Sequence, residues 1–257
     1  MTVVACRELA PTIGDVAANQ ALVLDTIAST HADVLVLPEL ATSGYLLASA
    51  DEARACALRA ADLAWSAAVR GGTVVVGGFA ELGDDGLVYN SAAVVTAQGL
   101  LAVHRKAHLW DGEKLLFTPG NKGATVVDTA HGRIAVMICY DAEFPEYTRA
   151  AALAGADLIA VPTNWPLVDR PQGERPPEVL IAQAAARVNR VAMALCDRTG
   201  TERGQQWTSG TTIVSHEGWI VAGPGGHQTV AMDLTAGRDK RIAERADVHA
   251  DRRTDLY

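Results

Sequence analysis

The stretch from Arg133 to Val161, RIAVMICYDAEFPEYTRAAALAGADLIAV, decides the fold class. An apolar run over Arg133–Cys139 predicts a buried strand, an alanine-rich segment over Phe144–Gly155 predicts a helix, and Asp157–Val161 predicts another strand. The same alternation of short β-branched runs with longer helical segments continues along nearly the whole chain. We therefore expect an α/β fold, formed as a single domain over residues 1–257.

Working outward, hydrophobic periodicity and glycine stops place the other elements. Gln98-Gly99 separates two strands and predicts a hairpin, so the sheet is expected to be mixed. Further helices are predicted over Asp15–His31, Asp51–Arg70 and Glu178–Arg190, with a loop over His108–Gly123. The other predicted strands are Thr2–Arg7, Ala32–Leu37, Thr73–Ala80, Val88–Ala97, Leu100–Arg105, Val191–Cys196, Gly210–Ser215, Trp219–Ala222 and Thr229–Leu234.

Two segments of the chain resemble each other. ADVLVLPE at 32–39 and ADLIAVPT at 156–163 each follow an alanine-rich helix and end a buried strand at a proline. One interpretation is that buried strands of α/β proteins simply look alike. The other is a pseudo-twofold fold in which each half brings a strand end to one site.

The charge balance narrows the classes of partner. The 257 residues include 22 Lys and Arg against 30 Asp and Glu, a formal net charge of −8. Nucleic acid and anionic membranes are excluded as partners, because phosphate contacts need clustered Lys and Arg. No basic and apolar leader and no apolar run near the roughly 18 residues of a membrane span are found, so a cytoplasmic location is expected.

The cysteines indicate a reducing environment. Cys6, Cys56, Cys139 and Cys196 are widely separated and form no CxxC pair, which excludes a disulfide framework or a zinc knuckle. The chain has no HExxH, no P-loop and no GxGxxG between a strand and a helix. We expect neither a metal nor an organic cofactor.

Three strand ends have side chains suited to chemistry: Glu39, Lys106 and Cys139. In open α/β sheets, sites lie beyond the carboxyl ends of strands. Each residue alone has a structural alternative, as a helix cap, a solvated lysine or a core thiol. Cys139, however, is predicted to stand at a sharp strand-to-helix turn, where helix amides lower a thiol pKa and can bind an oxyanion. Glu39 can serve it as a base and Lys106 as a cation.

The segments LPE at Glu39, HRKAHL around Lys106 and CYDAEFPE around Cys139 resemble the Glu-Lys-Cys signature of the nitrilase superfamily of carbon–nitrogen hydrolases. APTIGDVAAN, TSGY, FTPG and DRTGTERGQQW also match segments of that family, so the resemblance covers nearly the whole chain. It implies an α-β-β-α sandwich that dimerises into an α-β-β-α-α-β-β-α assembly. The charged tail Arg238–Tyr257 is then a candidate dimer arm, or otherwise a frayed terminus.

The resemblance also assigns roles at the site. It implies that Cys139 is the nucleophile, Glu39 the general base and then acid, and Glu113 a second glutamate that positions substrate. Lys106 and the Tyr140 backbone N–H are expected to bind the oxyanion of a tetrahedral intermediate. With two acids and one lysine in a closed pocket, at least one acid should have a raised pKa, while Lys106 favours ionisation of the other.

The signature limits the substrate less closely. CYD and KxHL resemble the amidase branches, which implies hydrolysis of a small carboxylic acid amide through a cysteine thioester, releasing ammonia. Ala142 and Glu143 stand where carbamoyl-amino-acid hydrolases tend to have arginines. An omega-amidase, an N-carbamoyl amine hydrolase and a nitrilase remain alternatives. Asn164 and Trp165 are predicted to line the acyl pocket, with Tyr45 as a further candidate, although Trp165 is equally suited to a core or interface position.

Two interpretations of another class compete with hydrolysis. The chain could be a non-catalytic binding subunit of the same fold, although intact Glu39, Lys106, Glu113 and Cys139 argue against it. Alternatively, Cys139 could be a redox sensor, with Cys196 as the only suggested resolving thiol.

Overall fold

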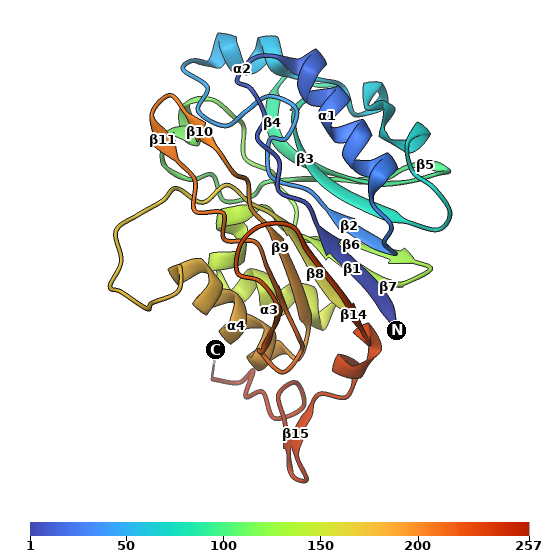
Figure 1. The fold of residues 1–257 in the computed structure, drawn as a ribbon. Helices are drawn as coiled ribbons and strands as arrows, with labels where there is room; N and C mark the ends of the chain where they lie inside the picture. Colours follow the sequence, from blue (N-terminus) through green and yellow to red (C-terminus); the bar gives the residue numbers. More distant parts are fainter. Residues whose placement is uncertain (257) are drawn as a thin grey trace.

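Two six-stranded mixed sheets pack face to face in the computed structural model, which describes residues 1–256, and helices cover both outer faces (Figure 1). The first sheet has the order β14 (Gln228–Met232), β1 (Thr2–Cys6), β2 (Val34–Val36), β3 (Val74–Leu82), β4 (Val88–Thr96), β5 (Gly99–Arg105). The second has the order β13 (Ile220–Ala222), β12 (Thr212–Val214), β9 (Ala192–Cys196), β8 (Leu158–Pro162), β7 (Gly132–Val136), β6 (Thr125–Thr129). This arrangement confirms the α-β-β-α sandwich.

The helices lie outside the two sheets. α1 (Val16–Ser29) and α2 (Ala50–Cys56) cover the first sheet, whereas α3 (Pro145–Leu153) and α4 (Pro177–Asn189) cover the second (Figure 1). Asp15 caps α1 by accepting from the Ala18 N–H. Within residues 1–256, no helix has both the length and the apolar character needed to cross a membrane.

Each sheet is built around three parallel strands. β1, β2 and β3 run parallel in the first sheet, and β7, β8 and β9 do so in the second, with antiparallel strands on both flanks. The two similar sequence segments contain β2 and β8, the middle strands of these trios. Beyond their ends, the Glu39 N–H donates to the Thr163 carbonyl at 3.3 Å, and Asn164 Nδ2 donates to the Glu39 carbonyl at 3.0 Å. This contact supports the pseudo-twofold interpretation.

Alternating side chains of the central strands build two separate layers of core. In β2, Val34 and Val36 point into the core between the sheets, whereas Leu35 packs outward with Val23 and Ile27 of α1. All five side chains are buried. Successive side chains of a strand point to opposite faces of its sheet, so a central strand that is covered on both faces needs apolar residues at every position.

The predicted helix over Asp51–Arg70 is wrong. Only α2 is α-helical, and the chain then becomes extended before two short 3₁₀ turns, Ala60–Asp62 and Ala64–Ala67. The Leu58 N–H donates to the Ala80 carbonyl and the Leu58 carbonyl accepts from the Leu82 N–H, both at 2.9 Å, along the end of β3 that extends past β2. Pairing with this strand end, together with burial of Trp65, outweighs the helical propensity of the alanines.

Other boundaries also differ. The strand predicted to reach Cys139 ends at Val136, because Cys139–Glu143 forms a 3₁₀ turn before α3. The loop prediction for His108–Gly123 omits the 3₁₀ helix Asp111–Leu115. Four further short strands were not predicted: β10 (Thr201–Glu202), β11 (Gln205–Gln206), β15 (Arg241–Ala243) and β16 (Ala246–Asp247); β6 was also missed.

The described part of the C-terminal tail packs against its own chain. Arg238 forms a bidentate ion pair with Asp157, with both N–O distances at 2.8 Å, and Lys240 Nζ donates to the Arg190 carbonyl at 2.8 Å. Arg149 reaches the Val248 carbonyl at 3.2 Å. These contacts argue against a frayed terminus up to that point.

Trp65 should contribute strongly to stability, since its side chain is fully buried against Phe79 in the outer core of the first sheet. We expect Trp65→Ala to lower the free energy of unfolding by about 3–5 kcal/mol, measured by urea denaturation. Trp219→Ala is the matched control, because Trp219 is 69% exposed, and it should change stability by less than about 0.5 kcal/mol. Equal effects of the two substitutions would contradict the assignment of Trp65 to the core.

Candidate active site

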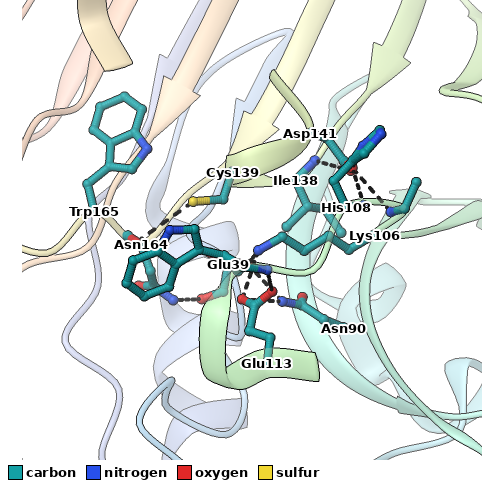
Figure 2. A network of polar contacts seen from close by, with 12 residues as sticks. Glu39, Asn90, Lys106, His108, Glu113, Ile138, Cys139, Asp141, Asn164 and Trp165 are labelled. Atoms are coloured by element: carbon teal, nitrogen blue, oxygen red, sulfur yellow. Dashed lines mark hydrogen bonds and ion pairs between the residues drawn. The ribbon is translucent and has the colours of Figure 1, made fainter. Parts of the chain in front are cut away.

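Side chains from the ends of both sheets converge on one buried cluster (Figure 2). Glu39 follows β2, Lys106 follows β5, Cys139 follows β7 and Asn164 follows β8. Glu113 joins them from the 3₁₀ helix Asp111–Leu115. The structure thus brings together the residues that the sequence singled out, which lie up to 125 positions apart.

The Lys106 ammonium group lies at the centre of this cluster. Its Nζ is 2.7 Å from Glu39 Oε1 and 2.8 Å from Glu113 Oε1, and the side chain has no exposed surface. Burial alone would lower the pKa of Lys106, but the charges of Glu39 and Glu113 raise it above its ordinary value. The lysine therefore remains a cation at neutral pH.

Asn90, on β4, is a site residue that sequence reasoning missed. Its Nδ2 donates to Glu39 Oε1 at 2.7 Å and to Glu113 Oε1 at 3.3 Å, so it links the same two oxygens that Lys106 binds. The Trp110 N–H donates to the other oxygen of Glu113 at 2.9 Å. A fully buried asparagine in the otherwise apolar strand VYNSAAVVT was the available signal.

A close backbone approach fixes the position of Glu39. The Gly78 N–H donates to the Pro38 carbonyl and the Gly78 carbonyl accepts from the Ala41 N–H, both at 2.9 Å. A β-carbon on Gly78 would lie 2.5 Å from the Glu39 Cα and from the Leu40 nitrogen. Only glycine lets β3 pass this close to the turn that presents the glutamate.

Glu39 has a free carboxylate oxygen. Oε1 accepts from Lys106 and Asn90, whereas Oε2 is buried without a hydrogen-bond partner. Burial raises the pKa of Glu39 to about 7, an effect that Lys106 partly opposes and Glu113 reinforces. This confirms the prediction of an acid with a raised pKa, and it leaves one oxygen available to exchange a proton near neutral pH.

Cys139 occupies a strained backbone position at the start of its 3₁₀ turn. Its φ is +46°, in the left-handed region that residues with a β-carbon rarely adopt. Its Sγ lies 3.8 Å from the Asn164 carbonyl oxygen (Figure 2). The turn is followed within six residues by α3, close to the sharp strand-to-helix transition predicted.

The prediction of a lowered thiol pKa at this turn is wrong. Burial and the neighbouring Glu39 charge raise the pKa of Cys139 well above its ordinary value, and Lys106 offsets them only in part. The residue is therefore a neutral thiol at pH 7, so a nearby base is required before it can act as a nucleophile.

Asp141 holds the segments that carry Lys106 and Cys139 in register, a role that the sequence did not reveal. Its carboxylate accepts from the His108 N–H at 2.9 Å and from the Ile138 N–H at 3.1 Å. His108 lies two residues after Lys106, and Ile138 directly precedes Cys139. His104 and His108 side chains also bond to it. Burial alone would raise the pKa of Asp141, but these histidine contacts hold it well below its usual range.

The residues predicted to line an acyl pocket lie on two sides of the cluster. Asn164 is buried and turned toward the Glu39 carbonyl (Figure 2), whereas Trp165 is 3% exposed and belongs to the hydrophobic core. Asp197, which sequence reasoning also missed, accepts from the Trp165 N–H at 3.0 Å, and burial raises its pKa to about 7. Tyr45 instead lines a cavity of about 320 Å³ together with Glu113.

Residues 1–256 contain neither a metal-binding cluster nor a disulfide. Within residues 1–256, no group of three or more His, Cys, Asp or Glu side chains is arranged to hold a metal ion. The four cysteines are free and buried, which agrees with the expected lack of a disulfide framework.

Comparison with known proteins gives a consistent result. The profile of the carbon-nitrogen hydrolase family matches residues 3–237. A nitrilase from Pyrococcus abyssi is 33% identical over 235 residues, covering 88% of this chain and 86% of that protein. A 2-oxoglutaramate amidase from Bacillus subtilis is 31% identical over 236 residues, covering 89% and 88%.

A solved structure with the same fold is a variant of the amidase from Nesterenkonia sp. AN1. It shows the product of Michael addition of acrylamide at that protein's active-site cysteine. The TM-score is 0.80 at 25% sequence identity, and the match covers 100% of this chain and 98% of that one.

The raised pKa of Glu39 predicts how the reactivity of Cys139 depends on pH. Below about pH 7 Glu39 is protonated and cannot accept the thiol proton, so alkylation by iodoacetamide should slow by about tenfold per pH unit. In Glu39→Gln the levelling-off above pH 7 should disappear, and the rate should keep rising with pH, because only the thiolate then reacts and the pKa of the Cys139 thiol is well above its ordinary value. Alkylation is followed by mass spectrometry of the peptide that contains Cys139.

Glu143→Gln is the matched control. Burial also raises the pKa of Glu143, which lies in the 3₁₀ turn of Cys139, whereas Lys106 Nζ donates to Glu39 and Glu113. This variant should keep the levelling-off above pH 7. An unchanged break near pH 7 in Glu39→Gln, or its loss in Glu143→Gln, would show that another group controls the thiol.

Proposed function

The chain belongs to the carbon–nitrogen hydrolase family, and we propose that it hydrolyses a small carboxylic acid amide to the acid and ammonia through a thioester on Cys139. Its relatives include nitrilase and amidases, and it is a hydrolase of carbon–nitrogen bonds other than peptide bonds. The observation on which the proposal rests is the buried Lys106, shared by two carboxylates beside a strained cysteine turn.

The first step is formation of the nucleophile. The Cys139 thiol is protonated at neutral pH, and Glu39 has a pKa of about 7 and an unpaired Oε2. Glu39 takes the thiol proton as the sulfur forms its bond to the amide carbon and the carbonyl π pair moves onto oxygen. A base with a pKa near the working pH is best suited to this transfer.

The developing negative charge on the carbonyl oxygen needs stabilisation. Lys106 remains cationic because Glu39 and Glu113 surround its Nζ. We assign the oxyanion to Lys106 Nζ and to the Tyr140 backbone N–H, which follows the nucleophile in its 3₁₀ turn. Loss of one such donor typically costs roughly 10²–10³ in rate.

The intermediate then collapses and the enzyme is regenerated. The oxyanion re-forms the carbonyl, the C–N bond breaks, and Glu39 gives its proton to the departing nitrogen, which leaves as ammonia. The same carboxylate then takes a proton from water as it attacks the thioester, and returns that proton to the Cys139 sulfur as the acid leaves. Glu113 positions Lys106 and the substrate throughout.

The reaction is tested by ammonia release from propionamide, butyramide, benzamide, glutaramate, N-carbamoyl-β-alanine, N-carbamoylputrescine and propionitrile. We expect turnover of the simple amides by the wild-type chain and none above background in Cys139→Ala. Glu39→Gln, which keeps the shape of the side chain, should lower kcat/KM by at least about 10²-fold, because it removes the proton carrier.

Each other result has a distinct meaning. Turnover of propionitrile alone would make the chain a nitrilase, and turnover of a carbamoyl compound alone would make it a carbamoyl amine hydrolase. Silence across the panel would favour a non-catalytic binding subunit. Loss of free thiols on peroxide treatment, with Cys139 and Cys196 joined, would favour a redox sensor.

We also propose that the chain acts as a homodimer. Three apolar side chains on the outer helical layer are each 44–49% exposed: Leu153 of α3, and Leu180 and Val188 of α4. The family resemblance implies pairing through these helices. Light scattering should give twice 27.0 kDa, and Leu180→Lys with Val188→Lys should shift the mass toward the monomer. A wild-type mass of one chain would contradict pairing.

A further inference from the structure

A cavity of about 320 Å³ lies between two segments, 45–50 and 110–116. Its lining is largely apolar, and the aromatic and aliphatic members are Tyr45, Leu46, Leu47, Trp110, Leu115 and Leu116. Volume and lining suit a small acyl group. Such a cavity near a nucleophile determines which substrates enter.

The cavity adjoins the buried cluster. Glu113 lines it and also accepts from Lys106 at 2.8 Å. Tyr45 lines it beside Glu113, and burial together with the negative charges of Glu113 and Glu39 raises the pKa of its hydroxyl well above the ordinary value. An amide whose carbonyl lies at Cys139 and Lys106 can therefore extend its acyl chain past Glu113 and Tyr45 into this cavity.

The charges around this cavity are of one sign. The charged residues among those that line it, all within the described chain, are Asp111 and Glu113, and both are acids. Lys106 Nζ is already bonded to Glu39 and Glu113. A carboxylate placed here would meet two acids, and none of the residues that line the cavity is a cation.

Arg203 is a cation next to this wall, but it is already bonded to other groups. Arg203 donates from Nη1 to the Leu46 carbonyl at 2.7 Å and from Nη2 to Glu52 Oε1 at 2.6 Å. The wall itself is fixed, because the Tyr45 and Leu46 N–H groups both donate to the buried Glu202 at 3.0 Å. Moving Arg203 into the cavity would break these contacts.

We propose that this cavity binds the acyl group and selects against amides whose acyl chain ends in a carboxylate. The inference rests on the proposed amidase function and narrows its substrate class to amides without a distal anionic group. It separates this chain in specificity from its 2-oxoglutaramate amidase relative, whose named substrate has a carboxylate in addition to its amide.

The test compares three amides of equal chain length: glutaramate, its neutral methyl ester, and 5-aminopentanamide, which has a terminal ammonium. We expect kcat/KM for glutaramate to lie at least about 100-fold below that of the ester, because its carboxylate loses water without gaining a cation. For the ammonium compound, kcat/KM should lie within about tenfold of the value for the ester, since Asp111 and Glu113 tolerate a positive charge.

A substitution in the cavity should reverse the selection. Leu115, which lines the cavity and is 82% exposed, accepts a long polar side chain without disturbing the core. Leu115→Arg should narrow the ratio of ester to glutaramate by at least about tenfold. Leu100→Arg is the control, because Leu100 is 43% exposed at the far end of β5, and it should leave the ratio unchanged.

Binding separates failure of this inference from failure of the amidase proposal. Calorimetry with Cys139→Ala should show the ester binding and glutaramate not, whether or not the wild-type chain turns over either compound. Glutaramate binding as tightly as the ester would overturn the inference. If that binding were lost in Lys114→Met, the exposed Lys114 would be the cation responsible, and the inference would again be wrong.

Discussion

The ammonium group of Lys106, fully buried between Glu39 and Glu113, is the constraint on which the rest of the site depends. An isolated charge removed from water is very costly, so a buried lysine needs carboxylates at contact distance and further donors to satisfy their oxygens. Here β2 supplies one acid, the 3₁₀ helix after β5 supplies the other, and Asn90 of β4 binds both. Because one missing partner would leave an uncompensated charge, these elements are fixed relative to one another.

This arrangement also sets the protonation states. Two carboxylates compete for one cation, and burial raises the pKa of Glu39 to about 7, while the Cys139 thiol is held protonated. The cluster therefore places a titratable carboxylate and a protonated thiol around one buried cation. In the reaction we propose, charge that develops on a substrate oxygen would meet a cation already in place, so little reorganisation is needed. A substrate that brings its own negative charge gains nothing from this balance.

Sequence reasoning predicted the central strands of both sheets and the helices α1, α3 and α4, but it missed β6 and the short strands β10, β11, β15 and β16. Glu39, Lys106 and Cys139 were recognisable as polar residues at the ends of apolar runs, and Glu113 only through the family resemblance. The predicted helix over Asp51–Arg70 failed because backbone pairing of Leu58 with β3 and burial of Trp65 are long-range interactions that local periodicity does not contain. The thiol pKa was predicted in the wrong direction for a related reason, since the turn geometry favours the thiolate whereas burial and Glu39 disfavour it.

The sequence by itself determined the α/β class, the family and the residue types available for chemistry, because these follow from periodicity and from local motifs; it left open whether the two similar segments reflect a pseudo-twofold fold. Only the tertiary structure decided that the ends of β2 and β8 meet, that Asp141 ties the Lys106 segment to the Cys139 turn, and that Gly78 makes room for Glu39. It also placed Trp165 in the core and Tyr45 at the cavity. The physical reason is that burial, electrostatic coupling and close backbone approach depend on residues distant in the chain, which no local pattern specifies.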